Sequence, residues 1–131
     1  DCYVDLISGK CVSVFLKKKI KMRAGETDKS VSINKKAVLS MVASFAEEAG
    51  YRGMIDLDLF EEGGVFYLSE VNPRFGGGYP HAYECGVNFP RLLLRNLEGK
   101  ENACEIGNYP PGITMMKYNE VKILPQEELI G

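Results

Sequence analysis

The chain of 131 residues is 45% hydrophobic and 26% charged, a balance typical of one compact domain and unlike that of a disordered chain. Its 16 lysines and arginines face 18 aspartates and glutamates, and the net charge of -2 argues against a nucleic-acid-binding platform. No apolar run approaches the ~20 residues that cross a bilayer and no signal peptide opens the chain, so we expect no membrane partner.

The first half of the chain is predicted to contain two strands and a helix. Residues 2–7 read as a short strand, and residues 11–22 as a longer one in which apolar and cationic side chains alternate. Residues 24–30 are predicted to form a polar loop. A helix is then expected between Asn34 as its N-cap and Gly50 as its stop, because apolar residues recur at helical spacing between them.

The second half is predicted to hold a hairpin, two helices and a last strand. Residues 54–60 and 65–71 form the two hairpin strands, with glycines in the connection. A short helical stretch near Tyr83 is followed by a helix over about 88–97, and the tail offers a strand over 113–124. The order β-β-α-β-β-α-β predicts an α+β fold, an antiparallel sheet covered by helices.

Cysteine and histidine show no pattern of a disulfide framework or a zinc site. The four cysteines lack CxxC spacing, which favours reduced thiols in a cytoplasmic protein. The single histidine, His81, can share a helix face with Cys85, but two ligands do not complete a zinc site. Asp1 is not an initiator methionine and an extended pattern already runs at Cys2, so we interpret the chain as a segment of a longer one.

Carboxylates are predicted to gather on one face of the hairpin. Side-chain alternation puts Asp56 and Asp58 on the face opposite the apolar residues of the first strand, and puts Glu70 and Asn72 together on the second. A connection of three or five residues centred on Gly64 would place Asp58 across from Glu70 and Asp56 across from Asn72. Opposed like charges destabilise a sheet, and Mg²⁺ would compensate them. The alternative is a solvated outer face.

The segment after the hairpin carries an arginine and three glycines. Arg74 follows the strand end at Asn72 and would lie beside the acidic cluster, where a guanidinium can stabilise charge on a transferred phosphoryl group. Its alternative is a surface arginine. Residues 76–78 either let the backbone approach a ligand closely or form a plain turn, and the sequence leaves both open. The row Lys17, Lys19 and Lys21 is interpreted as protection of an exposed sheet edge.

The run from Glu70 to Gly78, Glu-Val-Asn-Pro-Arg-Phe-Gly-Gly-Gly, resembles the ATP-grasp superfamily and is closest to proteins like the large subunit of carbamoyl phosphate synthase. The resemblance implies that Glu70 and Asn72 bind metal and that Arg74 is catalytic. It gives Asp58, twelve residues before Glu70, as a third ligand, although many relatives have Glu or Gln there.

A second element supports the resemblance. The run Arg23-Ala-Gly-Glu-Thr27 is similar to the family loop that closes over the phosphates, which implies ATP contact and a catalytic role for Arg23. Relatives phosphorylate a carboxylate or bicarbonate with ATP, and an amine then attacks the acyl phosphate. The cofactors implied are ATP and Mg²⁺, which Mn²⁺ can replace, and the substrates are a small carboxylate and a small amine.

By this resemblance the chain is a single fragment, 1–131, of a longer ligase. The C-terminal lobe of an ATP-grasp fold would occupy about residues 1–100, followed by an extension over about 101–131. The partner is the N-terminal lobe of the same protein, and a homo-oligomer is compatible with this arrangement. We expect the fragment alone to be inactive and to bind Mg-ATP weakly.

Two other interpretations of the chain are open. One is a degenerate, non-catalytic ATP-grasp module used for binding or assembly, and the other is a plain α+β domain with a solvated acidic face. The intact set Asp58, Glu70, Asn72 and Arg74 favours the enzyme over the degenerate module.

Overall fold

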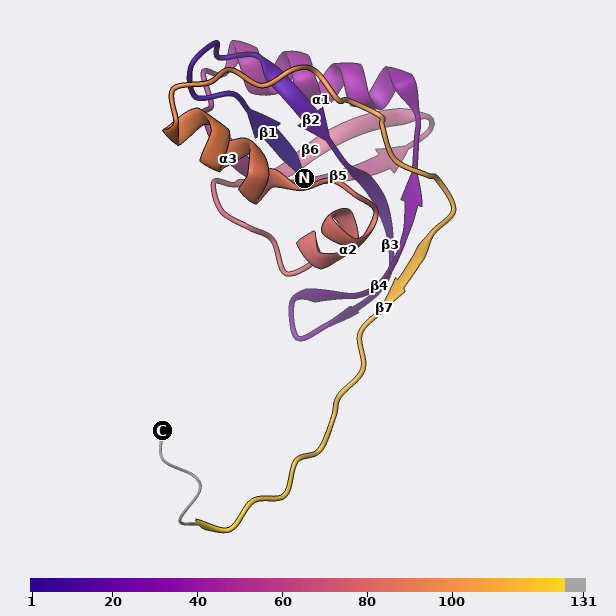
Figure 1. The fold of residues 1–131 in the computed structure, drawn as a ribbon. Coiled ribbons are helices and arrows are strands. Elements are labelled where there is room, and N and C mark those ends of the chain that lie inside the picture. The colour runs from indigo at the N-terminus through magenta and orange to yellow at the C-terminus, as the bar shows by residue number, and fades with distance from the viewer. Residues whose placement is uncertain (127–131) are drawn as a thin grey trace.

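Two antiparallel sheets and three helices make up the described part of the chain, residues 1–126, in a computed structural model (Figure 1). The first sheet has the strand order β2-β1-β5-β6 and the second the order β3-β4-β7. The strands are β1 (Cys2–Val4), β2 (Cys11–Val14), β3 (Leu16–Arg23), β4 (Glu26–Ile33), β5 (Gly53–Glu62), β6 (Val65–Asn72) and β7 (Thr114–Met116), and the helices are α1 (Lys36–Glu48), α2 (Tyr79–Glu84) and α3 (Phe89–Leu97). Among residues 1–126, no helix has the length and apolar content needed to span a membrane.

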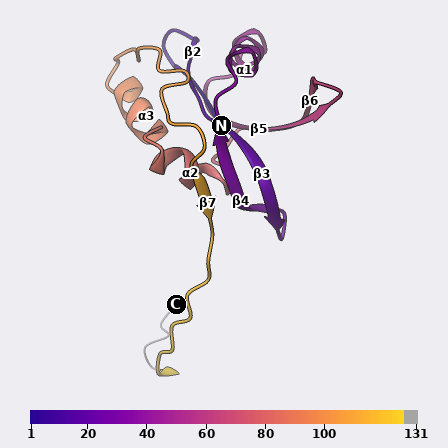
Figure 2. The ribbon, with the colours of Figure 1, turned by 90° about the vertical axis from the view of Figure 1, so that its right-hand side faces the viewer.

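Helices cover both faces of the first sheet, which agrees with the predicted α+β fold of antiparallel strands covered by helices. Cys2 and Val4 of β1 belong to a core cluster with the apolar stripe of α1, whereas Tyr3 between them packs in a second cluster with Phe89 of α3 and residues of α2. Alternate side chains of a strand point to opposite faces, so β1 is buried on both sides. Figure 2 shows the β3–β4 and β5–β6 hairpins projecting from this body on the side away from α3.

The prediction of one strand over 11–22 is wrong because the chain changes sheets at Phe15. The Phe15 side chain is 1% exposed and packs against Tyr109 and His81, with ring centroids 4.6 and 5.1 Å apart. The buried ring lies between the end of β2 at Val14 and the start of β3 at Leu16, where the chain leaves the first sheet and enters the second. The alternation continues through the break, and for that reason the sequence gives no sign of it.

The predicted polar loop over 24–30 is also wrong, because residues 26–33 form β4 and pair with β3. The polar composition of residues 24–30 favoured a loop. Ser30 and Ser32 are buried, and their hydroxyls bond to His81 Nδ1 at 2.8 Å and to the Pro110 carbonyl at 2.8 Å. A buried hydroxyl is tolerated where it has a hydrogen-bond partner, and here the partners are distant in sequence.

The helix ends follow the predictions in part. Asn88 caps α3, since its side chain accepts a hydrogen bond from the Arg91 N–H at 2.9 Å. Gly50, with φ of +74°, directly follows the C-cap of α1. The predicted N-cap Asn34 is wrong: the N-cap is Lys35, without a side-chain bond, and Asn34 instead donates to the Gly107 carbonyl at 2.9 Å.

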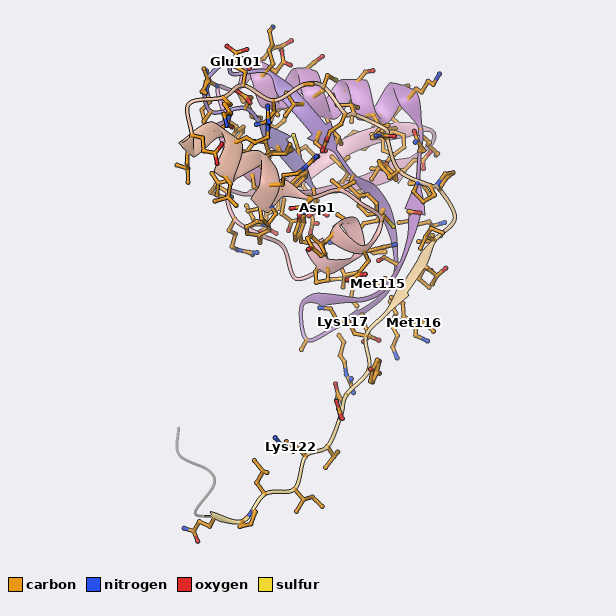
Figure 3. The ribbon with its side chains drawn as sticks, in the orientation of Figure 1. Asp1, Glu101, Met115, Met116, Lys117 and Lys122 are labelled. Atoms are coloured by element: carbon orange, nitrogen blue, oxygen red, sulfur yellow. The ribbon has the colours of Figure 1, made fainter. Side chains whose placement is uncertain are left out.

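Residues 101–117 run back across the body. The Glu105 N–H donates to the Val12 carbonyl at 2.7 Å, and the Tyr109 hydroxyl donates to the Ile33 carbonyl at 2.7 Å. The strand predicted over 113–124 shortens to β7 (Thr114–Met116), and the tail beyond it leads away from the body to Lys122 (Figure 3). Residues 127–131 of the expected extension lie outside the described part.

His81 ties α2 to this returning segment. Its Nε2 lies 3.0 Å from the Ile113 carbonyl, which can only accept, so Nε2 donates and Nδ1 accepts from the Ser30 hydroxyl. Burial lowers the pKa of His81, Lys17 adds to the effect, and the bond to Ile113 opposes it. Both ring nitrogens are therefore engaged in holding the fold together.

Candidate functional site

The β5–β6 hairpin pairs its polar residues as predicted, but its turn is shorter than expected and its pairing contains a bulge. Asp58 lies opposite Glu70, and Asp56 lies opposite Asn72, as the alternation predicts. The connection has two residues, Gly63 and Gly64, both at positive φ (58° and 82°), and not the three or five that were expected.

A β-bulge reconciles the short turn with this register. Leu59 pairs with Leu68 and Asp58 with Glu70, so Ser69 is left without a residue opposite it. Uninterrupted pairing from a two-residue turn would set Glu70 against Leu57, on the face away from Asp58. The extra residue shifts the ladder by one position and returns Glu70 to the acidic face.

This acidic face opens onto a cleft of about 830 Å³ between the two projecting hairpins. One wall is the β5–β6 hairpin with Arg74 beyond it, and the other comes from β3 and the two ends of β4. The polar and charged lining includes Lys17, Lys18, Lys19, Thr27, Asp56, Asp58, Glu70, Asn72 and Arg74. The cleft therefore carries carboxylates on one side and ammonium groups on the other.

Three lysines of β3 line the cleft in addition to forming part of a sheet edge, and two of them, Lys17 and Lys19, pair with carboxylates. β3 is an edge strand, as the interpretation of the lysine row assumed. Lys19 Nζ, however, lies 2.5 Å from Asp58 Oδ1, with both side chains 33% exposed. Lys17 pairs with Asp1 and is buried, and burial lowers its pKa to about 8, although the charges of Asp56 and Asp58 oppose this shift.

The glycine-rich segment lies directly on these charged groups. A Cβ placed on Gly76 would be 2.5 Å from Asp56 Cγ and Oδ2, and one on Gly78 would be 2.7 Å from Lys17 Cε. No side chain fits at such distances. The sequence left a plain turn and a close backbone approach to a ligand open for residues 76–78. The structure shows instead that Gly76 and Gly78 lie against side chains of the cleft floor, and the approach to a ligand stays a prediction.

The two arginines differ in position. Arg74 lines the cleft, and its Nη1 donates to the Phe75 carbonyl at 3.2 Å. Arg23 ends β3 at a tight turn through Ala24 and Gly25, both at positive φ (48° and 78°). Arg23 is not among the lining residues of the cleft, although Gly25 is. The structure thus brings Asp58, Glu70, Asn72 and Arg74 together in the lining of one cleft. Arg23 lies apart from them, beside the turn of the β3–β4 hairpin.

The metal-binding potential of the cleft rests on oxygen donors. Among residues 1–126, no group of three or more His, Cys, Asp and Glu side chains is placed to hold a metal ion. Asp58 and Glu70 face each other and Asn72 adds an amide oxygen on the same face. Mg²⁺ is commonly bound by one or two carboxylates with water and substrate phosphates. The oxygen atoms of Asp58, Glu70 and Asn72 therefore fit a Mg²⁺ ion whose remaining ligands would be water and the phosphates of a bound nucleotide.

An aromatic pair on the same hairpin face was missed in the sequence. Phe60 pairs with Tyr67 across the hairpin, one pair beyond Leu59 and two residues beyond Asp58. The rings stack with centroids 5.1 Å apart, and the side chains remain 52% and 44% exposed. The alternation that grouped Asp56 and Asp58 extends to Phe60, so the signal was present.

The chain has an α+β fold in which two antiparallel hairpins enclose a cleft lined by carboxylates, an amide and lysines, and this arrangement is consistent with a lobe of an ATP-grasp domain. The family model described as ATP-grasp in the biosynthetic pathway with Ter operon matches residues 1–122, and the chain belongs to this family. It is therefore an ATP-grasp module of the ATP-dependent ligase type. Comparison with curated proteins gives no match.

Proposed function

We propose that the cleft binds Mg-ATP and activates a carboxylate or bicarbonate as an acyl phosphate, which an amine then attacks. The observation that carries the proposal is the pair Asp58 and Glu70, held opposite each other on the wall of the cleft. Asn72 completes the oxygen donors. Bound Mg²⁺ would neutralise phosphate oxygens, and the carboxylates of this face would orient it.

Other residues in and beside the cleft act on the phosphates and the base in this proposal; Arg74, Lys17 and Lys19 line the cleft, whereas Arg23, Phe60 and Tyr67 lie outside its lining. Arg74 stabilises negative charge on the transferred phosphoryl group, and Arg23 reaches the γ-phosphate from the β3–β4 turn. Lys17 and Lys19 add positive charge on the opposite wall. The exposed Phe60–Tyr67 pair provides apolar surface against which a purine can pack.

The complete site requires a partner lobe that precedes this chain in a longer protein. We propose that this lobe covers the nucleotide from the other side, and that the 131-residue chain alone binds Mg-ATP weakly and has no turnover. The resemblance of residues 70–78 to carbamoyl-phosphate-synthase-like proteins supports carboxylate–amine ligation. It does not imply carbamoyl phosphate as the product. The small acid and the amine are substrates in this proposal.

Glu70→Gln tests the assignment, with Glu62→Gln near the turn of the same hairpin as the matched control. Mg-ATP affinity, measured by NMR titration of the chain, is expected to fall about tenfold or more in Glu70→Gln, because one metal-binding carboxylate is lost. The control is expected to bind as the wild type does. Equal affinities in all three proteins, or an affinity loss matched by equal unfolding, would contradict the proposal. Binding without turnover in the two-lobed protein would favour the non-catalytic module.

A further inference from the structure

We infer that the Lys19 ammonium is an internal competitor for the metal site: it pairs with Asp58 in the metal-free protein and is displaced when a divalent cation binds. This inference rests on the proposed function and concerns the state of the cleft before the cation arrives. The direct contact is Lys19 Nζ to Asp58 Oδ1 at 2.5 Å, which occupies an oxygen that would bind the metal.

The charge balance of the hairpin face explains why such a competitor is present. Asp56, Asp58 and Glu70 share one face, and Asp58 and Glu70 are directly opposed, an arrangement that destabilises a sheet when both are ionised. Lys19 supplies a positive charge to this face from β3. A divalent cation supplies two, and an ammonium group beside it would then be repelled.

The exposure of the pair shows that the exchange is open to solvent. Both side chains of the Lys19–Asp58 pair are 33% exposed, so water can solvate each group when they separate. The neighbouring pair of Lys17 and Asp1 is different, with side-chain exposures of 8% and 0%. Separating that pair would leave buried charges without a partner, which is strongly unfavourable. Lys19 is therefore the exchangeable lysine and Lys17 the fixed one.

The test is the affinity of the metal alone, measured without nucleotide. Mn²⁺ is titrated into the wild type, Lys19→Met and Lys21→Met, and free Mn²⁺ is followed by its EPR signal. Lys21 lies on the same strand, but its Nζ is 3.9 Å from Asp28 and its side chain is 63% exposed, so its removal makes the same change in net charge away from Asp58. Lys19→Met is expected to bind Mn²⁺ about threefold to tenfold more tightly than Lys21→Met.

A measurement on the wild type removes any dependence on folding of the variants. On titration with Mg²⁺, the NMR signal of the Lys19 ε-methylene group is expected to move to the position of a free lysine, while that of Lys17 stays in place. Equal Mn²⁺ affinities in the two lysine variants, or an unmoved Lys19 signal at saturating Mg²⁺, would overturn the inference.

A control at Glu70 separates this inference from the proposed function. If Glu70→Gln weakens Mn²⁺ binding and Lys19→Met does not strengthen it, the metal site stands and the competition is refuted. If neither the wild type nor Lys19→Met binds Mn²⁺ with or without ATP, both are refuted. Lys19→Met binding where the wild type does not would be the strongest support.

Discussion

Replacement of Gly76 by alanine tests whether the glycine-rich segment must touch the floor of the cleft. The added Cβ would lie 2.5 Å from Asp56 Cγ and Oδ2, about 0.9 Å inside the 3.4 Å at which ordinary contact begins. Asp56 is a short side chain on a paired strand, so relief requires a new rotamer or a shift of the loop. Such overpacking costs about 1–3 kcal/mol. The backbone at Gly76 is not left-handed, so alanine brings no conformational penalty there.

The steric origin is isolated by a double-mutant cycle. Urea unfolding is measured for Gly76→Ala in the wild type and in an Asp56→Ala background, where the carboxylate is absent. We expect the cost to fall below about 0.5 kcal/mol in that background, which gives a coupling of about 1–2 kcal/mol. Gly99→Ala is the control, because its φ is +76° and the space around it is open. Gly99→Ala should lower the free energy of unfolding by about 1 kcal/mol in both backgrounds.

The reasoning fails if Gly76→Ala loses the same free energy of unfolding in both backgrounds. It also fails if the substitution is neutral in the wild type. In either case the glycine would be needed for its turn alone, and Asp56 would not be held by the loop.

Two further predictions concern stability. Asp5 accepts six hydrogen bonds, from Ile7, Ser8, Asn96 and Asn102, which lower its pKa although burial raises it. Asp5→Asn should therefore destabilise the fold by about 2–4 kcal/mol in urea unfolding, with Asp28→Asn below about 1 kcal/mol as control, and a loss no larger than the control would contradict it. Because burial lowers the pKa of His81 in the fold, the unfolded chain takes up more protons below pH ~6.5, and stability should fall on acidification from there. His81→Gln should remove this part of the pH dependence in thermal unfolding at pH 5–8, and an unchanged profile would refute its origin in His81.

The sequence predicted the parts of the site that depend on local periodicity. Asp58 and Glu70 are twelve residues apart on two strands joined by a glycine turn. Side-chain alternation groups Asp58 with Asp56 and Glu70 with Asn72, and the bulge at Ser69 brings both pairs to one face. The helical spacing that predicted α1 is local in the same sense. Contacts between residues that are close in sequence follow from short-range backbone geometry, so the amino-acid sequence alone is enough to predict them.

The placement of β4 and of the lysines could not be predicted in this way. Ser30 reads as a loop residue until its hydroxyl is known to bond His81, and the bond from Ser32 to Pro110 is equally distant in sequence. Lys19 reads as an exposed edge residue until β3 is known to face Asp58 across the cleft. These partners are 39 to 78 residues away in sequence, and no periodic pattern encodes them.

The sequence by itself determined which chemical groups the cleft would hold: carboxylates, an amide and an arginine at the end of one hairpin. Tertiary structure decided how they meet. The bulge at Ser69 selects the face on which Glu70 lies, because a shift of one residue reverses the side of every later side chain in a strand. The change of sheets at Phe15 brings Lys19 onto Asp58, since burial of one aromatic ring among distant residues sets the direction of β3.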